Sequence, residues 1–178
     1  LVQLEEGSVA TSYVPHSSNT KQISLSEPLR ALPNGVKDKV VKVGGKWYVE
    51  RNCGEIVLDG SEGWSCSYGG LNEGTRPNTR HFYCSDFDGI IKPGSVFLCN
   101  NFIYAYVYGN DVVGLDLVAG ATRIRIGHTA KSDTEFKTWL QNNPTIIVFE
   151  LRAPIYEEII DPTINTYNDT THISNNST

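Results

Sequence analysis

Short runs of β-branched and aromatic residues recur along the chain, and clusters of Gly, Asn, Asp, Ser and Pro separate them. Such runs are typical of β-strands, because these side chains suit a pleated, half-buried surface. The predicted strands cover residues 21–25, 38–43, 46–50, 55–59, 79–84, 95–99, 102–108, 122–126 and 145–151. Many short strands joined by turns favour an antiparallel fold over an α/β fold. We therefore predict an all-β protein, an antiparallel β-sandwich that is jelly-roll-like, over residues 23–160.

Two turns follow from residue type. Pro33 fixes its own backbone angle, and Asn34-Gly35 can supply the positive φ of a tight turn. Gly44-Gly45 stands between the predicted strands 38–43 and 46–50 and is typical of a two-residue hairpin loop. The predicted sandwich therefore begins with a turn at residues 33–35 and a hairpin at residues 38–50.

One helix is expected, at about residues 132–142. Ser132 and Glu135 form a capping-box pattern, in which the serine accepts from a backbone amide and the glutamate reaches back. Phe136, Trp139 and Leu140 then share one face of the helix. Pro144 ends the pattern, because proline disfavours helix in the residue before it. The helix is expected to cover an edge or an end of the sandwich.

The two ends of the chain differ from its middle, being polar and rich in turn residues. We expect residues 1–22 to connect from a preceding module and residues 161–178 to be a C-terminal connecting segment. The chain begins with Leu and contains no Met, so we expect it to be a fragment of a longer protein.

Composition narrows the function classes. The chain has 178 residues, 39% of them hydrophobic, which is enough for a core, and a net charge of −5. That charge argues against nucleic acid as a partner, since phosphate binding requires clustered Lys and Arg. No apolar run approaches the roughly 20 residues of a membrane helix, so no membrane insertion is expected.

The spacing of the four cysteines fits no zinc motif. A disulfide framework stays open, but we expect reduced and mostly buried thiols. The four cysteines are Cys53, Cys66, Cys84 and Cys99.

No catalytic motif is visible, and we predict a protein that is not an enzyme and needs no cofactor or metal. The four histidines lie far apart, and no nucleophile elbow or His-Glu-x-x-His motif occurs. Asp86 and Asp88 could hold a hard cation or could simply form a turn. Glu157, Glu158 and Asp161 could imitate a glycosidase pair, but neighbouring carboxylates in a polar segment are usually solvated.

A predicted strand with three tyrosines is a stronger candidate for a binding site than any of these residues is for a catalytic site. In residues 102–108 a period of two places Tyr104, Tyr106 and Tyr108 on one face and the aliphatic residues between them on the other. Tyrosine combines apolar area with a polar tip, which suits the C–H faces and hydroxyl rims of sugars. The alternative is a tyrosine ladder that only stabilises the sheet.

The second candidate region is the insert of residues 65–82. Loops on a rigid β scaffold often carry recognition, although an ordinary surface loop would look the same. Trp47 and Trp64 are expected in the core or an interface rather than under a sugar. The candidate carbohydrate-binding residues of the insert are Tyr68, Asn72, Arg76, Asn78 and Arg80.

Three stretches resemble a known family. QLEEGSVATSYVPH (residues 3–16) is similar to the closing strand and exit segment of carbohydrate-binding-like modules in tail proteins of phages and prophages of Gram-positive bacteria. Residues 27–41 and 54–64 resemble the start of the next module. The helix at 135–140 and the segment 151–158 resemble the close of that module. The resemblance spans residues 3–160 in order and transfers no binding residues.

The resemblance implies a minor structural or receptor-binding protein in the tail or baseplate of a virion, made in the bacterial cytoplasm. Host cell-wall glycan and other tail proteins would be its partners, and a homotrimer is compatible with it. We therefore expect non-catalytic adhesion to a wall polysaccharide or a teichoic-acid-type polymer. The alternatives are a purely structural or trimerising tail-fibre module and, third, an enzyme that trims glycans.

Overall fold

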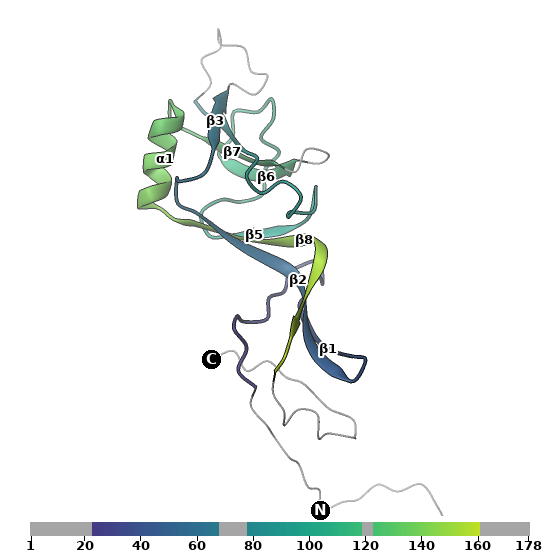
Figure 1. Cartoon of the computed structure of the whole chain (residues 1–178). Helices are drawn as coiled ribbons and strands as arrows, with labels where there is room; N and C mark the ends of the chain where they lie inside the picture. Colours follow the sequence, from purple (N-terminus) through teal and green to yellow (C-terminus); the bar gives the residue numbers. More distant parts are fainter. Residues whose placement is uncertain (1–22, 68–77, 119–122, 161–178) are drawn as a thin grey trace, which may run out of the picture.

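The computed structural model describes residues 23–67, 78–118 and 123–160. Within these ranges the chain forms two four-stranded antiparallel sheets and one helix (Figure 1). One sheet has the strand order β1-β2-β8-β5 and the other β3-β4-β7-β6. The elements are β1 (Lys39–Val43), β2 (Lys46–Leu58), β3 (Trp64–Ser67), β4 (Arg80–Cys84), β5 (Phe97–Cys99), β6 (Gly114–Val118), β7 (Arg123–His128), α1 (Asp133–Asn142) and β8 (Thr145–Glu158). The predicted all-β, sandwich-like class is confirmed.

A hydrophobic core fills the space between the two sheets. Alternation along the strands builds it: in β7, Ile124 and Ile126 face the core while Arg123 and Arg125 occupy the other face. Leu58, Ile147 and Phe149 contribute from the β2–β8 side, and Phe82, Leu115 and Leu117 from the opposite sheet. One face of such a strand therefore packs in the core, and the other faces solvent or a covering loop.

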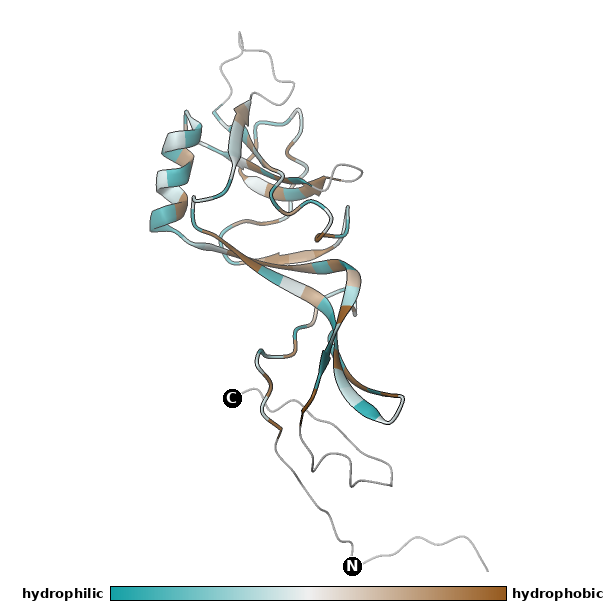
Figure 2. Ribbon diagram, in the orientation of Figure 1, coloured by the Kyte–Doolittle hydropathy of each residue, from teal (hydrophilic) through white to brown (hydrophobic). Residues whose placement is uncertain are grey.

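Helix α1 covers one side of the sandwich (Figure 1), as expected. Ser132 is the N-cap and accepts a hydrogen bond from the Glu135 amide at 3.1 Å. The Glu135 carboxylate reaches back to the Lys131 amide, one residue earlier than a standard capping box requires. Phe136 and Leu140 are buried, while the side of the helix turned away from the sheets is largely hydrophilic (Figure 2). The predicted helix and its boundaries are confirmed.

Strands β2 and β8 are longer than predicted. The separate runs 46–50 and 55–59 join into β2, a strand of 13 residues, and β8 continues beyond the predicted range 145–151 to Glu158. Their pairing shifts register between Arg51 and Cys53, where residues 151–154 of β8 lie opposite Asn52. Such a bulge bends a strand and increases its twist. Beyond it, β1 and the paired ends of β2 and β8 project from the sandwich (Figure 1). We call this part, residues 39–51 and 155–158, the projecting arm.

The predicted turns at the base and tip of the arm are both confirmed. The Gly35 amide donates to the Leu32 carbonyl at 3.0 Å, and Gly35 has a φ of 88°. Gly44 and Gly45 have φ values of 57° and 85° and join β1 to β2 through a two-residue loop. Two positive φ values match a type I′ turn, whose twist suits a tight hairpin.

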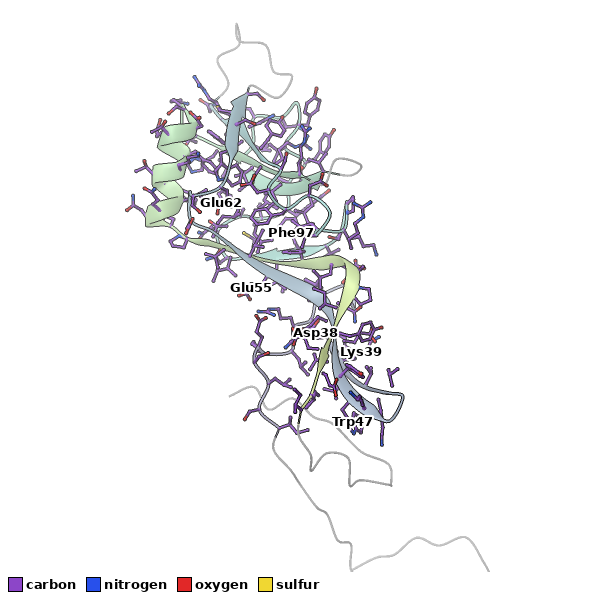
Figure 3. The ribbon with its side chains drawn as sticks, viewed as in Figure 1. Asp38, Lys39, Trp47, Glu55, Glu62 and Phe97 are labelled. Atoms are coloured by element: carbon purple, nitrogen blue, oxygen red, sulfur yellow. The ribbon has the colours of Figure 1, made fainter. Side chains whose placement is uncertain are left out.

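The root of the arm contains a buried ion pair. Arg51 Nη1 lies 3.1 Å from Asp38 Oδ2, and the two side chains are only 4% and 0% exposed. Arg51 also donates to the carbonyls of Glu27 and Pro28 and to the Glu157 carboxylate. Figure 3 shows Asp38 where the arm leaves the sandwich. The pair therefore ties the incoming chain, β2 and β8 together at one point.

Three sequence predictions about strands need correction. Residues 102–108 form no strand, and residues 23–25 of the predicted first strand have no regular structure, while 21 and 22 lie outside the described residues. Strands β3 and β6 were not predicted. Both are short, and β6 contains Gly114 and Asp116, residue types that are depleted in strands. Tertiary pairing overrides their weak propensity.

The described cysteines are all free thiols, as predicted. Burial raises the pKa of Cys53 and of Cys84 to about 11 in each case. A thiol with such a pKa is almost entirely protonated at neutral pH and is a poor nucleophile or metal ligand. Cys53 and Cys84 are therefore packing residues.

We expect Gly60→Ala to destabilise the protein more than Gly35→Ala. Both glycines have φ values near 87°, a conformation that costs other residues about 1–2 kcal/mol. A Cβ at Gly60 would also lie 2.3 Å from the Lys137 carbonyl oxygen of α1, whereas a Cβ at Gly35 meets nothing within 4 Å. Urea unfolding of both variants measures the difference. Equal losses would mean that the turn moves away from the helix at no cost.

Candidate functional site

The tyrosine segment, residues 102–108, runs beside β6 without joining the sheet as a strand. The Leu115 amide donates to the Ile103 carbonyl at 3.0 Å, and the Ala105 amide donates to the Leu115 carbonyl at 3.1 Å. These two hydrogen bonds form one parallel bridge, between Tyr104 and Leu115. These backbone bonds hold the first half of the segment beside β6.

The three tyrosines are exposed, by 71% at Tyr104, 60% at Tyr106 and 48% at Tyr108. The aliphatic side of the predicted alternation is only partly as expected. Val107 is fully buried, but Ile103 is 76% exposed and does not reach the core. The segment leaves the period of two because it is an irregular covering loop and not a pleated strand.

The tyrosine segment and the loop that follows it lie on the outer face of the sheet β3-β4-β7-β6. Two glycines make room for this approach. A Cβ at Gly127 would lie 2.0 Å from the Val112 carbonyl oxygen, and a Cβ at Gly114 would lie 2.6 Å from the Ala105 Cβ. The absence of side chains at these positions lets the loop pack directly on the sheet.

A buried ion pair lies under the tyrosines. Arg125 Nε and Nη2 donate to Asp116 Oδ2 at 3.1 and 2.7 Å, across the β6–β7 ladder. The Arg125 Cζ lies 5.3 Å from the ring centroid of Tyr106 and 5.3 Å from that of Tyr108. Both distances are within the range of a cation–π contact. One guanidinium therefore contacts two exposed tyrosine rings.

Asp116 also holds the backbone of the segment, since its Oδ2 accepts from the Val107 amide at 2.7 Å. Its Oδ1 is buried and has no hydrogen-bond partner among the described residues. A buried carboxylate oxygen is normally satisfied, so this atom is an acceptor for an ordered buried water.

The far end of the loop is fastened to the start of β4. The Asp111 carboxylate accepts from the backbone amides of Asn78 and Thr79, and also from both of their side chains. Its hydrogen bond with the Thr79 side chain, followed by the bond from the Asn78 amide, lowers the pKa of Asp111 to about 2. Asn110 donates to the carbonyls of Tyr106 and Tyr108. The segment is therefore fixed at both ends.

The structure brings together only part of the predicted site. Asn78 lies at the end of the loop, where its amide group is bonded to Asp111. Arg80 starts β4 and, by alternation, shares the core-side face with Phe82, while Tyr83 shares the outer face with Arg125. Arg80 is thus turned away from the tyrosines. Tyr68, Asn72 and Arg76 lie outside the described residues.

Sequence reasoning missed the ion pair of this arrangement, Asp116 and Arg125, and the loop residues Asn110 and Asp111. A signal existed in the sequence around Arg125, because Arg123 and Arg125 alternate with two isoleucines and must occupy the face opposite the core. The sequence carried no sign that Asp116 belongs to a strand or that it pairs with Arg125, since that contact depends on the β6–β7 register.

The other predicted chemistry has ordinary structural surroundings. Asp86 Oδ2 accepts from the Gly63 amide at 2.7 Å and so braces the turn before β3. Within residues 23–67, 78–118 and 123–160, no group of three or more His, Cys, Asp or Glu is placed to hold a metal ion. In the same ranges, no helix has the length and apolar character needed to cross a membrane.

Comparison with known proteins gives no match. No family model fits the sequence, and no curated protein or solved structure is significantly similar to the chain. The resemblance to phage tail modules therefore stays a prediction.

Proposed function

We propose that this chain is a non-catalytic carbohydrate-binding module and that the tyrosine segment is its binding surface. The observation that supports this most directly is the exposure of three tyrosines on one fixed segment, two of them over a buried arginine. Exposed aromatic side chains gathered on a rigid loop are typical of recognition surfaces.

The chemistry of the surface suits a sugar. A tyrosine ring offers an apolar face to the C–H side of a pyranose, and its hydroxyl can bond to the hydroxyl rim. The surface is open, which suits a chain-like glycan better than a small enclosed ligand.

The biological setting is proposed from the sequence resemblance. In that setting the module belongs to a phage tail or baseplate, is made in the bacterial cytoplasm, and binds a glycan of the cell wall of a Gram-positive host. Other tail proteins would hold it in the virion. Adhesion of this kind needs no chemical step, which agrees with the structural roles that Asp86 and the buried thiols have in the fold.

We expect Tyr106→Ala to weaken binding to host cell walls by about 2 kcal/mol or more, the loss typical of an aromatic hot spot. The matched control is Tyr156→Ala, because Tyr156 is 53% exposed but lies in the projecting arm. Pull-down with purified walls from several Gram-positive hosts, followed by titration calorimetry on the best, measures both variants. Equal binding by Tyr106→Ala and the unmodified chain would remove the tyrosine segment as the site.

The projecting arm favours a second candidate function, a structural module that joins or trimerises tail-fibre segments. The arm exposes Val43, Ile155 and Tyr156, apolar side chains that a neighbouring subunit could cover. Sedimentation of the isolated chain separates the two functions. A stable trimer that binds no host wall would support the structural module, whereas wall binding by the chain supports the adhesin.

A further inference from the structure

We propose that Arg125 is a positioning residue of the glycan-binding surface, which sets the rings of Tyr106 and Tyr108 before any ligand arrives, and that the ligand is an uncharged sugar. This inference rests on the proposed function. The inference adds to that function a residue that need not contact the glycan itself. It also chooses a neutral wall polymer over a phosphate-bearing one.

The two rings are tied to one guanidinium. Its carbon lies 5.3 Å from both ring centroids, so any large rotation of either ring gives up a cation–π contact. Exposed tyrosines normally keep several rotamers, and fixing each on binding costs affinity. A ring that is already fixed avoids that cost.

Arg125 is itself fixed. Its side chain is 7% exposed, that of Asp116 is 5% exposed, and the nitrogen–oxygen distance between them is 2.7 Å. The same Asp116 oxygen accepts from the Val107 amide, which lies between the two tyrosines in the sequence. One buried ion pair therefore holds both the backbone and the rings of the segment, and its low-dielectric surroundings strengthen these contacts.

The charges that hold the tyrosine segment favour a neutral ligand. The positive charge of Arg125 is already matched by Asp116, so it attracts a phosphate weakly. Asp111 adds a negative charge at the end of the loop, where four hydrogen bonds keep it ionised. Asp116 Oδ1 is buried and adds no contact to a ligand on the surface.

The experiment compares Arg125→Lys with the unmodified 178-residue chain. Lysine keeps the charge next to Asp116 but lacks the flat guanidinium that contacts both rings. Aromatic NMR of ring-labelled tyrosine, without ligand, should show the Tyr106 and Tyr108 signals moving toward unstructured positions while Tyr48 and Tyr156 of the arm stay unchanged. Affinity for teichoic-acid-free wall polysaccharide should fall about tenfold, since two rings must now be ordered on binding.

Two controls separate positioning from general damage. Val49→Ala removes buried side-chain volume in the arm and should lower stability without moving the Tyr106 and Tyr108 signals or the affinity. Arg123→Met removes the exposed arginine two residues along the same face, and should leave binding of neutral polysaccharide unchanged.

Several results would overturn the inference. Unchanged ring signals in Arg125→Lys would show that the guanidinium does not hold the rings. Shifted signals with unchanged affinity would show that holding them does not matter for binding. Preference for purified teichoic acid, lost in Arg123→Met, would overturn the neutral ligand. If the unmodified chain binds no wall polymer, the proposed function fails, and the ligand-free ring signals still decide whether Arg125 positions the tyrosines.

Discussion

Replacing Arg51 with alanine is expected to lower the free energy of unfolding by about 3–5 kcal/mol, because it leaves Asp38 buried without its cation. Asp38 is buried, and its carboxylate also accepts from the amides of Arg30, Asn52 and Cys53. In the unmodified chain these amides surround a carboxylate whose charge Arg51 balances. Without Arg51, the Glu27 and Pro28 carbonyls also lose their donor.

Urea unfolding followed by circular dichroism measures this loss. Hydrogen exchange of the Asn52 and Cys53 amides, which both donate to Asp38, reports whether the root of the arm opens first. Lys39→Ala is the control, because Lys39 is 52% exposed and its pair with Glu50 is 3.6 Å long. Exposed pairs of this kind contribute about 1 kcal/mol or less. A loss below that value in Arg51→Ala would mean that water replaces the arginine.

The second large effect is expected for Phe136→Ala, with a loss of about 3–5 kcal/mol. Phe136 is fully buried, and its ring lies 4.2 Å from that of Phe82 in a stacked arrangement and 5.0 Å from that of Trp64 at a right angle. Its removal would leave a cavity between α1 and the sheet that the neighbouring rings cannot fill without leaving their own positions.

Thermal and urea unfolding of Phe136→Ala should agree on that loss. Thr138→Ala, on the exposed side of the same helix, should change stability by less than about 0.5 kcal/mol. If Phe136→Ala loses no more than Thr138→Ala, the contacts between the helix and the sheet contribute little to stability.

The parts of the fold that could be predicted are those that local chemistry specifies. The Gly44-Gly45 hairpin follows from two residues that accept positive φ, and α1 follows from a cap, a period and a proline. In each case the residues that decide the structure are neighbours in sequence. The predicted reduced thiols follow in the same way from residue type.

The parts that could not be predicted depend on distant contacts. Strand β6 exists because it pairs with β7, although Gly114 and Asp116 argue against a strand there. The tyrosine segment has strong strand propensity but forms a loop, because it packs against the sheet at Gly114 and Gly127. The contact between Arg125 and two tyrosines arises from that unforeseen path.

The arm has a mechanical consequence. Figure 1 shows the described segment before β1 and the C-terminal end of β8 on the same side of the molecule, beside the arm. A pull applied between these two points would pass from residues 27–28 through Arg51 to Glu157, and would load the β2–β8 ladder in the arm. The sheet that holds the tyrosine segment lies at the opposite end, outside this path. A tethered copy could therefore carry tension without distorting the surface that we propose holds the glycan.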